Sequence, residues 1–331
     1  MRVAFVMRGA LVAVLAVVVS SVGLPGAPAG ADPPTPPPLP GVNQPGGPGP
    51  CSVTPTSTTP APNPLAGLAR VWVYEPGGSA APTLTGGTCN DSQRPVLFVT
   101  HGFPYDPSIG CLDITPNGFQ LVDNMVSNGY IVVFANYACI PAAWWDVDAG
   151  FQHGVTMTSR EDVDRIGIWG HSWGGVMVSD LAKAAGDRGW GDDAMWLGIF
   201  ASLDPDNPAD LPDHARVLAV VYQGDTIVAN ADSAVLFNKF TDIPADHKRF
   251  VTVRSDCRGA NPCPPGQVAD HFTPSQPDEW SHLDYYGTVR NVHAFSTCAL
   301  TNTSCTTANL TTMGTWSDGV AATPALVTSS P

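Results

Sequence analysis

The stretch from residue 166 to residue 186, IGIWGHSWGGVMVSDLAKAAG, decides the fold of this chain. A short apolar strand, Ile166–Trp169, leads directly into the pentapeptide GHSWG at 170–174, which matches the pattern G-x-S-x-G. A helix-compatible segment, Val176–Gly186, follows it. The pattern alone is a weak signal in a chain with 33 glycines. The strand before it and the helix after it therefore carry the interpretation.

The glycines around Ser172 fit a sharp turn from a strand into a helix. Such a turn is strained and is approached closely by neighbouring chain, so Gly170 and Gly174 remove Cβ atoms that would clash. Gly175 lets the helix lie close to the sheet. The Ser172 hydroxyl then projects beyond the strand end, at a helix N-terminus where negative charge is favoured. The alternative is a glycine-rich turn with an ordinary capping serine; we predict that Ser172 is a nucleophile.

Apolar, β-rich runs alternate with helix-compatible segments along the rest of the chain. We predict strands at Ala69–Tyr74, Pro95–Thr100, Tyr130–Asn136, Ile166–Trp169, Trp196–Ala201, Arg216–Tyr222 and Arg249–Arg254, and helices at Asn117–Ser127, Val176–Gly186, Ala231–Phe240 and within Pro277–Leu300. This alternation is typical of an α/β fold with a mostly parallel, doubly wound sheet flanked by helices. Ligands bind such sheets at the carboxyl ends of the strands, so functional residues are expected there.

Two backbone N–H groups are expected to form an oxyanion site. One belongs to Trp173, the residue after the nucleophile, and the other to Phe103, in the run VLFVTHGFP that ends a strand. Two fixed donors aimed at a tetrahedral oxyanion lower a reaction barrier by several kcal/mol. For the side chain of His101 in the same run we favour a structural role, in which it holds the loop by hydrogen bonds.

Four segments together carry a resemblance to a known group of proteins: PVLFVTHGFP, VSNGYIVVFANY, DRIGIWGHSWGG and VVYQGDTIV. With them the chain resembles the cutinase-like polyester hydrolases and related secreted lipases of the α/β-hydrolase superfamily, over roughly residues 69–300. The match is specific for the superfamily and not for a subfamily. The resemblance implies the α/β-hydrolase fold and carboxylic ester hydrolysis through a Ser–His–Asp triad, without a metal or an organic cofactor.

The acid of such a triad follows a late strand, in the chain order nucleophile, acid, histidine. Asp225 lies just past the predicted strand Arg216–Tyr222 and matches the context that the resemblance implies. Its role would be to orient the histidine and to stabilise the imidazolium. Asp225 also fits an ordinary turn, since Gly-Asp is a common turn dipeptide. Asp204 and Asp206 are the alternatives.

The base is expected soon after the last predicted strand. There the chain departs from its relatives, because an insert with Cys257 and Cys263 delays the first histidine to His271. A disulfide between these cysteines would close the insert on itself and return His271 to the strand end. His282 and His293 are the alternatives, on a helix where histidine is more often packed or solvated. Four histidines come too early in the chain: His153, His171, His214 and His247.

Aromatic residues near the strand ends are candidates for the wall of a substrate pocket, where they would grip an apolar acyl or aryl group. They are Phe103, Tyr105, Trp144, Trp145 and Trp173. For Trp144 and Trp145 the alternative is that they only anchor a loop to the core. The short stretch between the predicted strand Tyr130–Asn136 and Ser172 leaves no obvious room for a lid domain.

The start of the chain predicts export. Residues 1–31 have the form of a secretory signal peptide, with a positively charged start, an apolar run at 9–19 and an Ala-Gly-Ala cleavage site. A retained membrane anchor is the alternative, although the apolar run is short for one. Residues 32–50 are expected to be a solvated Pro/Gly-rich linker, and residues 51–331 the catalytic domain.

Eight cysteines in an exported chain predict up to four disulfides. We expect the local pairs Cys257–Cys263 and Cys298–Cys305, and the pairs Cys51–Cys89 and Cys111–Cys139. The spacing does not fit a metal cluster, because no C-x-x-C motif is present.

The charge of the chain excludes one class of partner. A net charge of −14 and an isoelectric point near 4.7 would repel nucleic acid. The expected partner is a small-molecule, lipid or polymer ester, bound by a monomer outside the cytoplasm without a stable transmembrane anchor. Two other functions stay open: a cell-envelope acyltransferase that uses the same triad, and a non-catalytic binding protein on a hydrolase scaffold.

Overall fold

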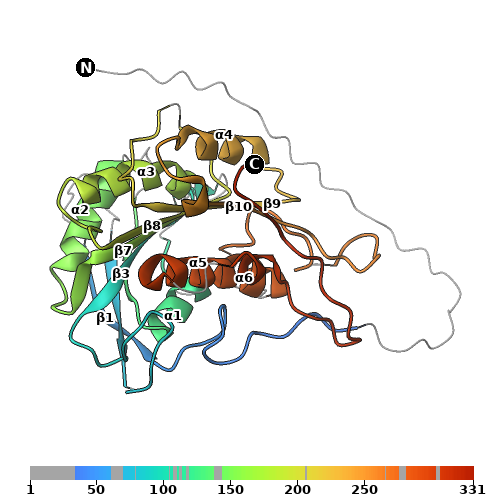
Figure 1. Ribbon diagram of the computed structural model, residues 1–331, viewed down its shortest axis with the longest axis horizontal. Coiled ribbons are helices and arrows are strands. Elements are labelled where there is room, and N and C mark those ends of the chain that lie inside the picture. The colour runs from blue at the N-terminus through green and yellow to red at the C-terminus, as the bar shows by residue number, and fades with distance from the viewer. Residues whose placement is uncertain are drawn as a thin grey trace, which may run out of the picture. The chain divides into compact units, whose positions relative to one another are not determined.

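A β-sheet of nine strands organises the computed structural model (Figure 1). The structure describes residues 34–60, 70–78, 80–103, 105–106, 110–111, 114–116, 119–137, 144–205, 207–264, 266–275, 281–302 and 306–331. Residues 35–331 form one compact unit. The signal peptide predicted at 1–31 lies outside the described residues. Within the described ranges, no helix is long and apolar enough to cross a membrane.

The strands run mostly parallel. Their order across the sheet is β1-β2-β6-β3-β7-β8-β9-β10-β11. The strands are β1 (Ser52–Pro60), β2 (Arg70–Gly77), β3 (Arg94–Thr100), β6 (Ile131–Ala135), β7 (Glu161–His171), β8 (Ala194–Phe200), β9 (Arg216–Tyr222), β10 (Lys248–Val253) and β11 (Leu326–Thr328). The six strands from β6 to β10 in this order pair in parallel, while β1, β2 and β11 join antiparallel at the two edges. Two short strands, β4 (Tyr105–Asp106) and β5 (Gly110–Cys111), pair separately.

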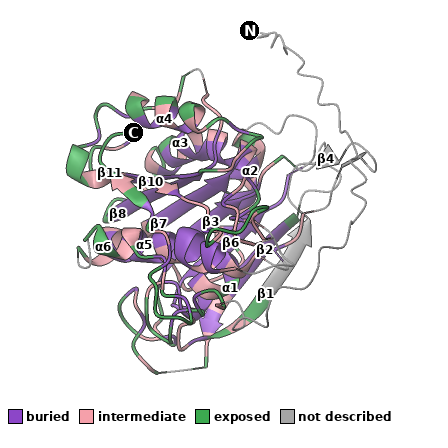
Figure 2. Cartoon of the chain, turned by 90° about the vertical axis from the view of Figure 1, so that its right-hand side faces the viewer, coloured by how far each residue is buried: buried purple, intermediate pink, exposed green. Residues whose placement is uncertain are grey.

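Helices cover both faces of the sheet, which explains why its central strands are apolar throughout (Figure 2). Along β3, Val96 and Phe98 belong to one buried cluster, and Leu97 and Val99 belong to the other. The helices α1 (Gln120–Ser127), α5 (Arg290–Thr301) and α6 (Ala308–Thr311) pack into the second of these clusters, and α2 (Trp144–Val155), α3 (Trp173–Gly186) and α4 (Asn230–Lys239) pack into the first. The carboxyl ends of the parallel strands therefore meet along one edge, between two helical layers.

All seven predicted strands are present, with ends that differ by a few residues, and the one predicted at 166–169 is the end of the longer strand β7. The helices predicted at 117–127, 176–186 and 231–240 correspond to α1, α3 and α4. The helix predicted within 277–300 is a π-helix, Leu283–Val289, that continues into α5. The described elements that the sequence does not predict are β1, β4, β5, α2, α6, β11 and a 3₁₀ turn at Ala245–His247.

Two of the expected disulfides are present in the described residues. Cys51 pairs with Cys89, with their Cα atoms 5.4 Å apart, and Cys257 pairs with Cys263, at 4.8 Å. Cys298 is also disulfide-bonded. Its expected partner, Cys305, and the expected pair Cys111–Cys139 lie outside the residues whose side chains are described.

Residues 34–50 differ from the expected solvated linker. The carbonyl oxygen of Gly47 accepts a hydrogen bond of 2.7 Å from the Asn124 side chain, and the N–H of Gly46 donates to Nδ1 of His293 at 3.3 Å. The glycines permit this packing, since a Cβ atom on Gly47 would lie 2.0 Å from the carbonyl oxygen of Gly41. Because its backbone groups find partners on α1 and α5, this segment belongs to the domain. The expected boundary at residue 51 is wrong.

Candidate active site

Ser172 lies on the tight turn between β7 and α3. Its backbone has φ 54° and ψ −121°, in a region that residues with a side chain rarely adopt. The turn is held in place from both sides: the N–H of Ser172 donates to the carbonyl oxygen of Phe200 on β8 at 2.8 Å, and its carbonyl oxygen accepts from the N–H of Gly175 at 3.0 Å. Such local strain persists only where the surrounding structure enforces it, and it is concentrated at functional sites.

Glycine is required around this turn for the steric reason that the sequence suggests. A Cβ atom on Gly170 would lie 2.5 Å from the carbonyl oxygen of Gly174, and one on Gly174 would lie 2.4 Å from that of His101. A Cβ atom on Gly175 would lie 2.8 Å from Cβ of Ser202, beyond the end of β8. The first two contacts are with backbone, which no rotamer change relieves. The close packing of three segments thus fixes the position of the Ser172 hydroxyl.

His271 and Asp225 meet Ser172 in a chain of hydrogen bonds. Nε2 of His271 lies 3.0 Å from Oγ of Ser172, and Nδ1 of His271 lies 2.8 Å from Oδ2 of Asp225. Because a carboxylate only accepts hydrogen bonds, Nδ1 carries the proton and Nε2 is left to accept from the serine hydroxyl. Ser172 and Asp225 follow the ends of β7 and β9, and His271 comes from the insert after β10. Their arrangement has the connectivity of a nucleophile, a base and an orienting acid.

Asp225 is held as a carboxylate. Its side chain is fully buried, with 0% exposure, and its Oδ1 accepts backbone N–H groups of Ile227 and Val228 at 2.9 Å each. Burial raises the pKa of Asp225, but the hydrogen bonds from His271, Val228 and Ile227 together outweigh burial and hold that pKa below its ordinary value. Asp225 therefore stays ionised and can stabilise a positive charge on His271.

The insert after β10 returns His271 to the site. Within the insert, the Cys257–Cys263 disulfide closes a short loop. The carbonyl oxygen of Ala269 then accepts the N–H of Gly224 at 2.7 Å, and the N–H of Ala269 donates to Oγ of Ser255 at 2.9 Å. The first bond docks the chain one residue before Asp225, beyond the end of β9, and the second ties it to the residue two positions beyond β10. The position of His271 thus depends on the fold of the whole insert.

The alternative acid and base residues make other contacts. Both carboxylate oxygens of Asp204 accept from Lys239, at 2.8 and 2.7 Å, and Asp206 lies outside the described residues. His282 is buried with its ring 5.5 Å from the ring of Trp316. His293 accepts the N–H of Gly46, as described above. In the described structure, none of these side chains is bonded to Ser172 or His271.

The loop after β3 passes directly beside Ser172, as an oxyanion site would require. A Cβ atom on Gly102 would lie 3.2 Å from Cβ of Ser172. Phe103 follows Gly102, and its ring is 6.3 Å from that of Trp173. Trp173 is the first residue of α3, so its N–H has no acceptor within the helix. The backbones of both predicted donors, Phe103 and Trp173, therefore border Ser172.

The side chain of His101 is part of the packing beneath this loop. It is 1% exposed, its Nδ1 donates to the carbonyl oxygen of Gly102 at 2.6 Å, and its Nε2 lies 2.9 Å from Oδ1 of Asn136. Its ring stacks on that of Tyr137, whose hydroxyl donates to the carbonyl oxygen of His101. These contacts fit the structural role that the sequence favours for His101.

Exposed apolar side chains surround the triad. Phe103 is 49% exposed, Ile227 57% and Phe272 50%. Phe272 packs edge-on against the ring of His271, and the N–H of Ile227 binds Asp225. Sequence reasoning missed Ile227 and Phe272, although both are within two residues of a predicted triad member. That adjacency is the signal by which they could have been found.

The other predicted wall residues stand apart from this group. Trp144 and Trp145 begin α2, with their rings 5.9 Å apart. Trp144 packs against the core and Trp145 is 62% exposed. The backbone of Tyr105 forms part of β4, and its side chain lies outside the described residues. No described contact joins either tryptophan to the triad.

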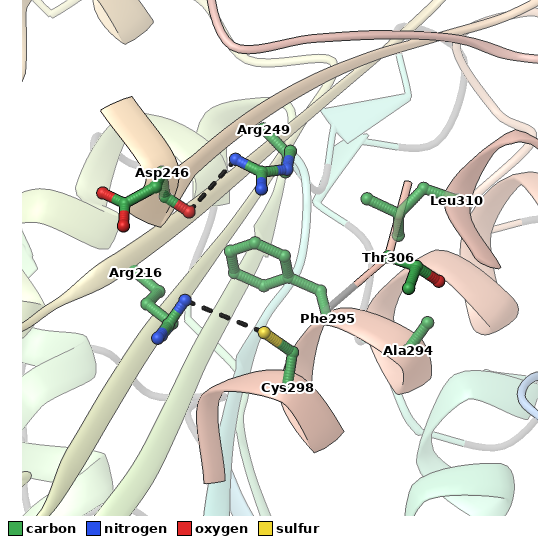
Figure 3. Close-up of a pocket in the computed structure, with 8 residues that line it drawn as sticks. All are labelled: Arg216, Asp246, Arg249, Ala294, Phe295, Cys298, Thr306 and Leu310. Atoms are coloured by element: carbon green, nitrogen blue, oxygen red, sulfur yellow. Dashed lines mark hydrogen bonds between the residues drawn. The ribbon is translucent and has the colours of Figure 1, made fainter. Parts of the chain in front are cut away.

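A small cavity lies at the other edge of the sheet (Figure 3). It is lined by Arg216 and Arg249, which stand at the starts of β9 and β10, and by Cys298 of α5. Arg216 points toward Sγ of Cys298, 3.7 Å away, and Arg249 donates to the carbonyl oxygen of Asp246 at 3.1 Å. Its volume of about 10 Å³ holds at most one water molecule. This cavity is too small for a substrate.

Comparison with known proteins does not assign this site a function. The chain matches no protein-family model, and no curated protein matches it.

Proposed function

We propose that this chain is a serine hydrolase of the α/β-hydrolase fold that cleaves carboxylic esters through an acyl-enzyme intermediate. The observation that carries the proposal is the chain of hydrogen bonds from Ser172 to His271 to Asp225, at 3.0 and 2.8 Å. The strained turn at Ser172 supports it, as does the chain order nucleophile, acid, histidine on a mostly parallel sheet. The assembled triad favours a catalyst over a binding protein that has lost its activity.

The reaction would proceed in two halves. Nε2 of His271 takes the proton of the Ser172 hydroxyl, and Oγ attacks the ester carbonyl carbon. The backbone N–H groups of Phe103 and Trp173 hold the resulting oxyanion. The imidazolium, stabilised by ionised Asp225, then protonates the leaving alkoxide as the tetrahedral intermediate collapses to an acyl-enzyme. Water activated by His271 attacks this ester, and the acid is released.

The surroundings of the triad favour an apolar substrate. Phe103, Ile227 and Phe272 offer about half of their surface to solvent and are placed on three different loops. An acyl or aryl group that covers these side chains buries apolar surface, and each Å² buried stabilises the complex by about 25 cal/mol. We therefore propose esters with an apolar acyl or aryl portion as substrates.

The disulfides support an extracytoplasmic location. Cys51–Cys89 and Cys257–Cys263 require an oxidising compartment to form and persist. Together with the signal peptide expected at 1–31, they favour secretion of the enzyme. A monomeric state stays a prediction.

The test is hydrolysis of p-nitrophenyl esters of increasing acyl length by the wild type and by single variants. We expect turnover by the wild type, with loss of about 10⁴-fold or more in kcat for Ser172→Ala and for His271→Ala. Ser52→Ala, at an exposed position on β1, is the matched control and keeps wild-type rates. Wild-type rates in Ser172→Ala would refute the proposal, and loss in His282→Ala with retention in His271→Ala would refute the assigned base.

A further inference from the structure

His171 is a buried histidine that lies beside both the nucleophile and the base. It is the last residue of β7, directly before Ser172, and is 4% exposed. Its ring lies 4.8 Å from the ring of His271 at an interplanar angle of 46°. The proposed reaction gives this side chain no part, although its ring packs against the ring of the base.

The ring of His171 makes one directed contact with the base, through the main chain. Its Nε2 lies 2.8 Å from the carbonyl oxygen of His271. A carbonyl oxygen only accepts hydrogen bonds, so Nε2 carries a proton and donates it. Burial, followed by the nearby His271, lowers the pKa of His171 to about 3. The ring is thus neutral at neutral pH, and its single N–H is committed to this carbonyl.

The other side of the ring meets the loop that borders Ser172. A Cβ atom on Gly102 would lie 3.3 Å from Nδ1 of His171. The ring therefore fills the space between the Gly102 backbone and the backbone of His271. Its own Cα position is fixed by β7, which is paired on both sides within the sheet. The sheet therefore fixes the position of the His171 ring, and its Nε2–H donates to the segment that carries the base.

We infer that His171 is a positioning residue: its Nε2–H holds the main-chain carbonyl of His271 and so fixes the imidazole against Ser172. This segment needs such a hold, because it ends an insert of the chain rather than a strand. A misplacement of the base by about 1 Å costs on the order of 10²-fold in rate. The activity readouts of this inference rest on the proposed function.

Two substitutions of His171 by polar amides distinguish the effect of the hydrogen bond to the His271 carbonyl from the effect of filling the space with a side chain. The amide nitrogen of glutamine reaches about as far from Cα as Nε2 of histidine, whereas that of asparagine reaches only the position of Nδ1. We expect His171→Asn to lower kcat by about 10- to 100-fold with little change in KM, and His171→Gln to keep most of the wild-type kcat. Equal kcat values for the two variants would overturn the inference, whether both are high or both are low.

A second measurement needs no substrate. The proton between Nδ1 of His271 and Asp225 gives a far-downfield proton NMR signal when it is held in a short, water-excluded bond. We expect this signal to be kept in His171→Gln and to broaden or move upfield in His171→Asn, with both variants folded by near-UV circular dichroism. An unchanged signal in His171→Asn would contradict the inference. Because the signal belongs to the resting protein, it decides the inference even if the wild type hydrolyses no ester.

Discussion

Oδ2 of Asp225 accepts a hydrogen bond from Nδ1 of His271 while Oδ1 of the same carboxylate accepts two backbone N–H groups. The carboxylate cannot rotate without breaking these bonds. It therefore selects one tautomer and one ring orientation for His271. In that orientation Nε2 faces Ser172.

Asp225→Asn should lower kcat by about 10⁴-fold, because an amide can donate to Nδ1 and so favours the tautomer whose Nε2 carries a proton. The measurement is steady-state kinetics with a p-nitrophenyl ester. Asp204→Asn is the control, since Asp204 pairs with Lys239 instead. A loss of activity in Asp204→Asn that matches that of Asp225→Asn would contradict the assignment.

Gly174→Ala should destabilise the protein by about 1–3 kcal/mol or more and abolish ester hydrolysis. The added methyl group would lie 2.4 Å from the carbonyl oxygen of His101, so the loop beside Ser172 must move. Gly41→Ala is the control, since its methyl group would meet only the Gln44 side chain at 3.7 Å. Thermal unfolding and kcat report the two effects; a stable and active Gly174→Ala enzyme would show that the close approach at Ser172 is not required.

The disulfide Cys51–Cys89 should matter mainly for stability, and the disulfide Cys257–Cys263 should also matter for kcat. Loop-closure entropy predicts that replacing Cys51 and Cys89 by serine costs about 4 kcal/mol of unfolding free energy, for a separation of 38 residues. The same change at Cys257 and Cys263, which are 6 residues apart, costs about 2 kcal/mol. Well below the melting temperature, only the second pair should lower kcat, because it closes the insert that carries His271. Urea unfolding and ester kinetics on both double variants test this, and the reverse order of effects on kcat would refute it.

Two buried titratable groups, His293 and Asp284, should change the free energy of unfolding with pH in opposite directions. Burial lowers the pKa of His293 to about 3, so between about pH 3 and 6.5 the unfolded state binds a proton that the folded state does not. This contribution to stability is complete above about pH 6.5 and falls on acidification. Burial raises the pKa of Asp284 to about 7, so its contribution is complete below about pH 4 and is lost as the pH rises toward 7.

His293→Gln should therefore make the fall in stability on acidification shallower, and Asp284→Asn should make it steeper. Each change is expected to be up to about 1.4 kcal/mol per pH unit. Urea unfolding at several pH values between about 4 and 6.5 measures both slopes. If the slope of unfolding free energy against pH changes in the same direction in both variants, His293 and Asp284 do not have opposite effects on the pH dependence, and the prediction is wrong.

The central sheet could be predicted from the sequence because its strands are buried on both faces. Continuous apolar runs such as that of β3 have no other common explanation at this length. The edge strand β1, SVTPTSTTP, was missed because it pairs with one neighbour only and carries no apolar run. The helix α2 was missed because Gly150 and Gly154 resemble helix breakers. A Cβ atom on Gly154 would lie 2.4 Å from Val133, so glycine is needed there for packing.

The residues of the candidate site could be predicted where chain order and strand ends determine them. Ser172, Asp225 and His271 each follow a strand that is evident in the sequence. The bond from His171 to the carbonyl oxygen of His271 joins residues 100 positions apart, and no local pattern encodes it. The same is true of residues 34–50, whose composition suggests a solvated linker and whose partners lie far along the chain.

The docking of this first described segment constrains how the protein can be made. The N–H of Thr35 donates to Oγ of Ser317, the N–H of Ser317 donates to the carbonyl oxygen of Thr35, and the Tyr286 hydroxyl donates to the carbonyl oxygen of Pro38. Thr35 thus binds a residue that is synthesised 282 positions later. The bond of Gly47 to Asn124 can form early in synthesis, but the bonds of Thr35 cannot form before residue 317 has been made, so the docking of this segment is completed late.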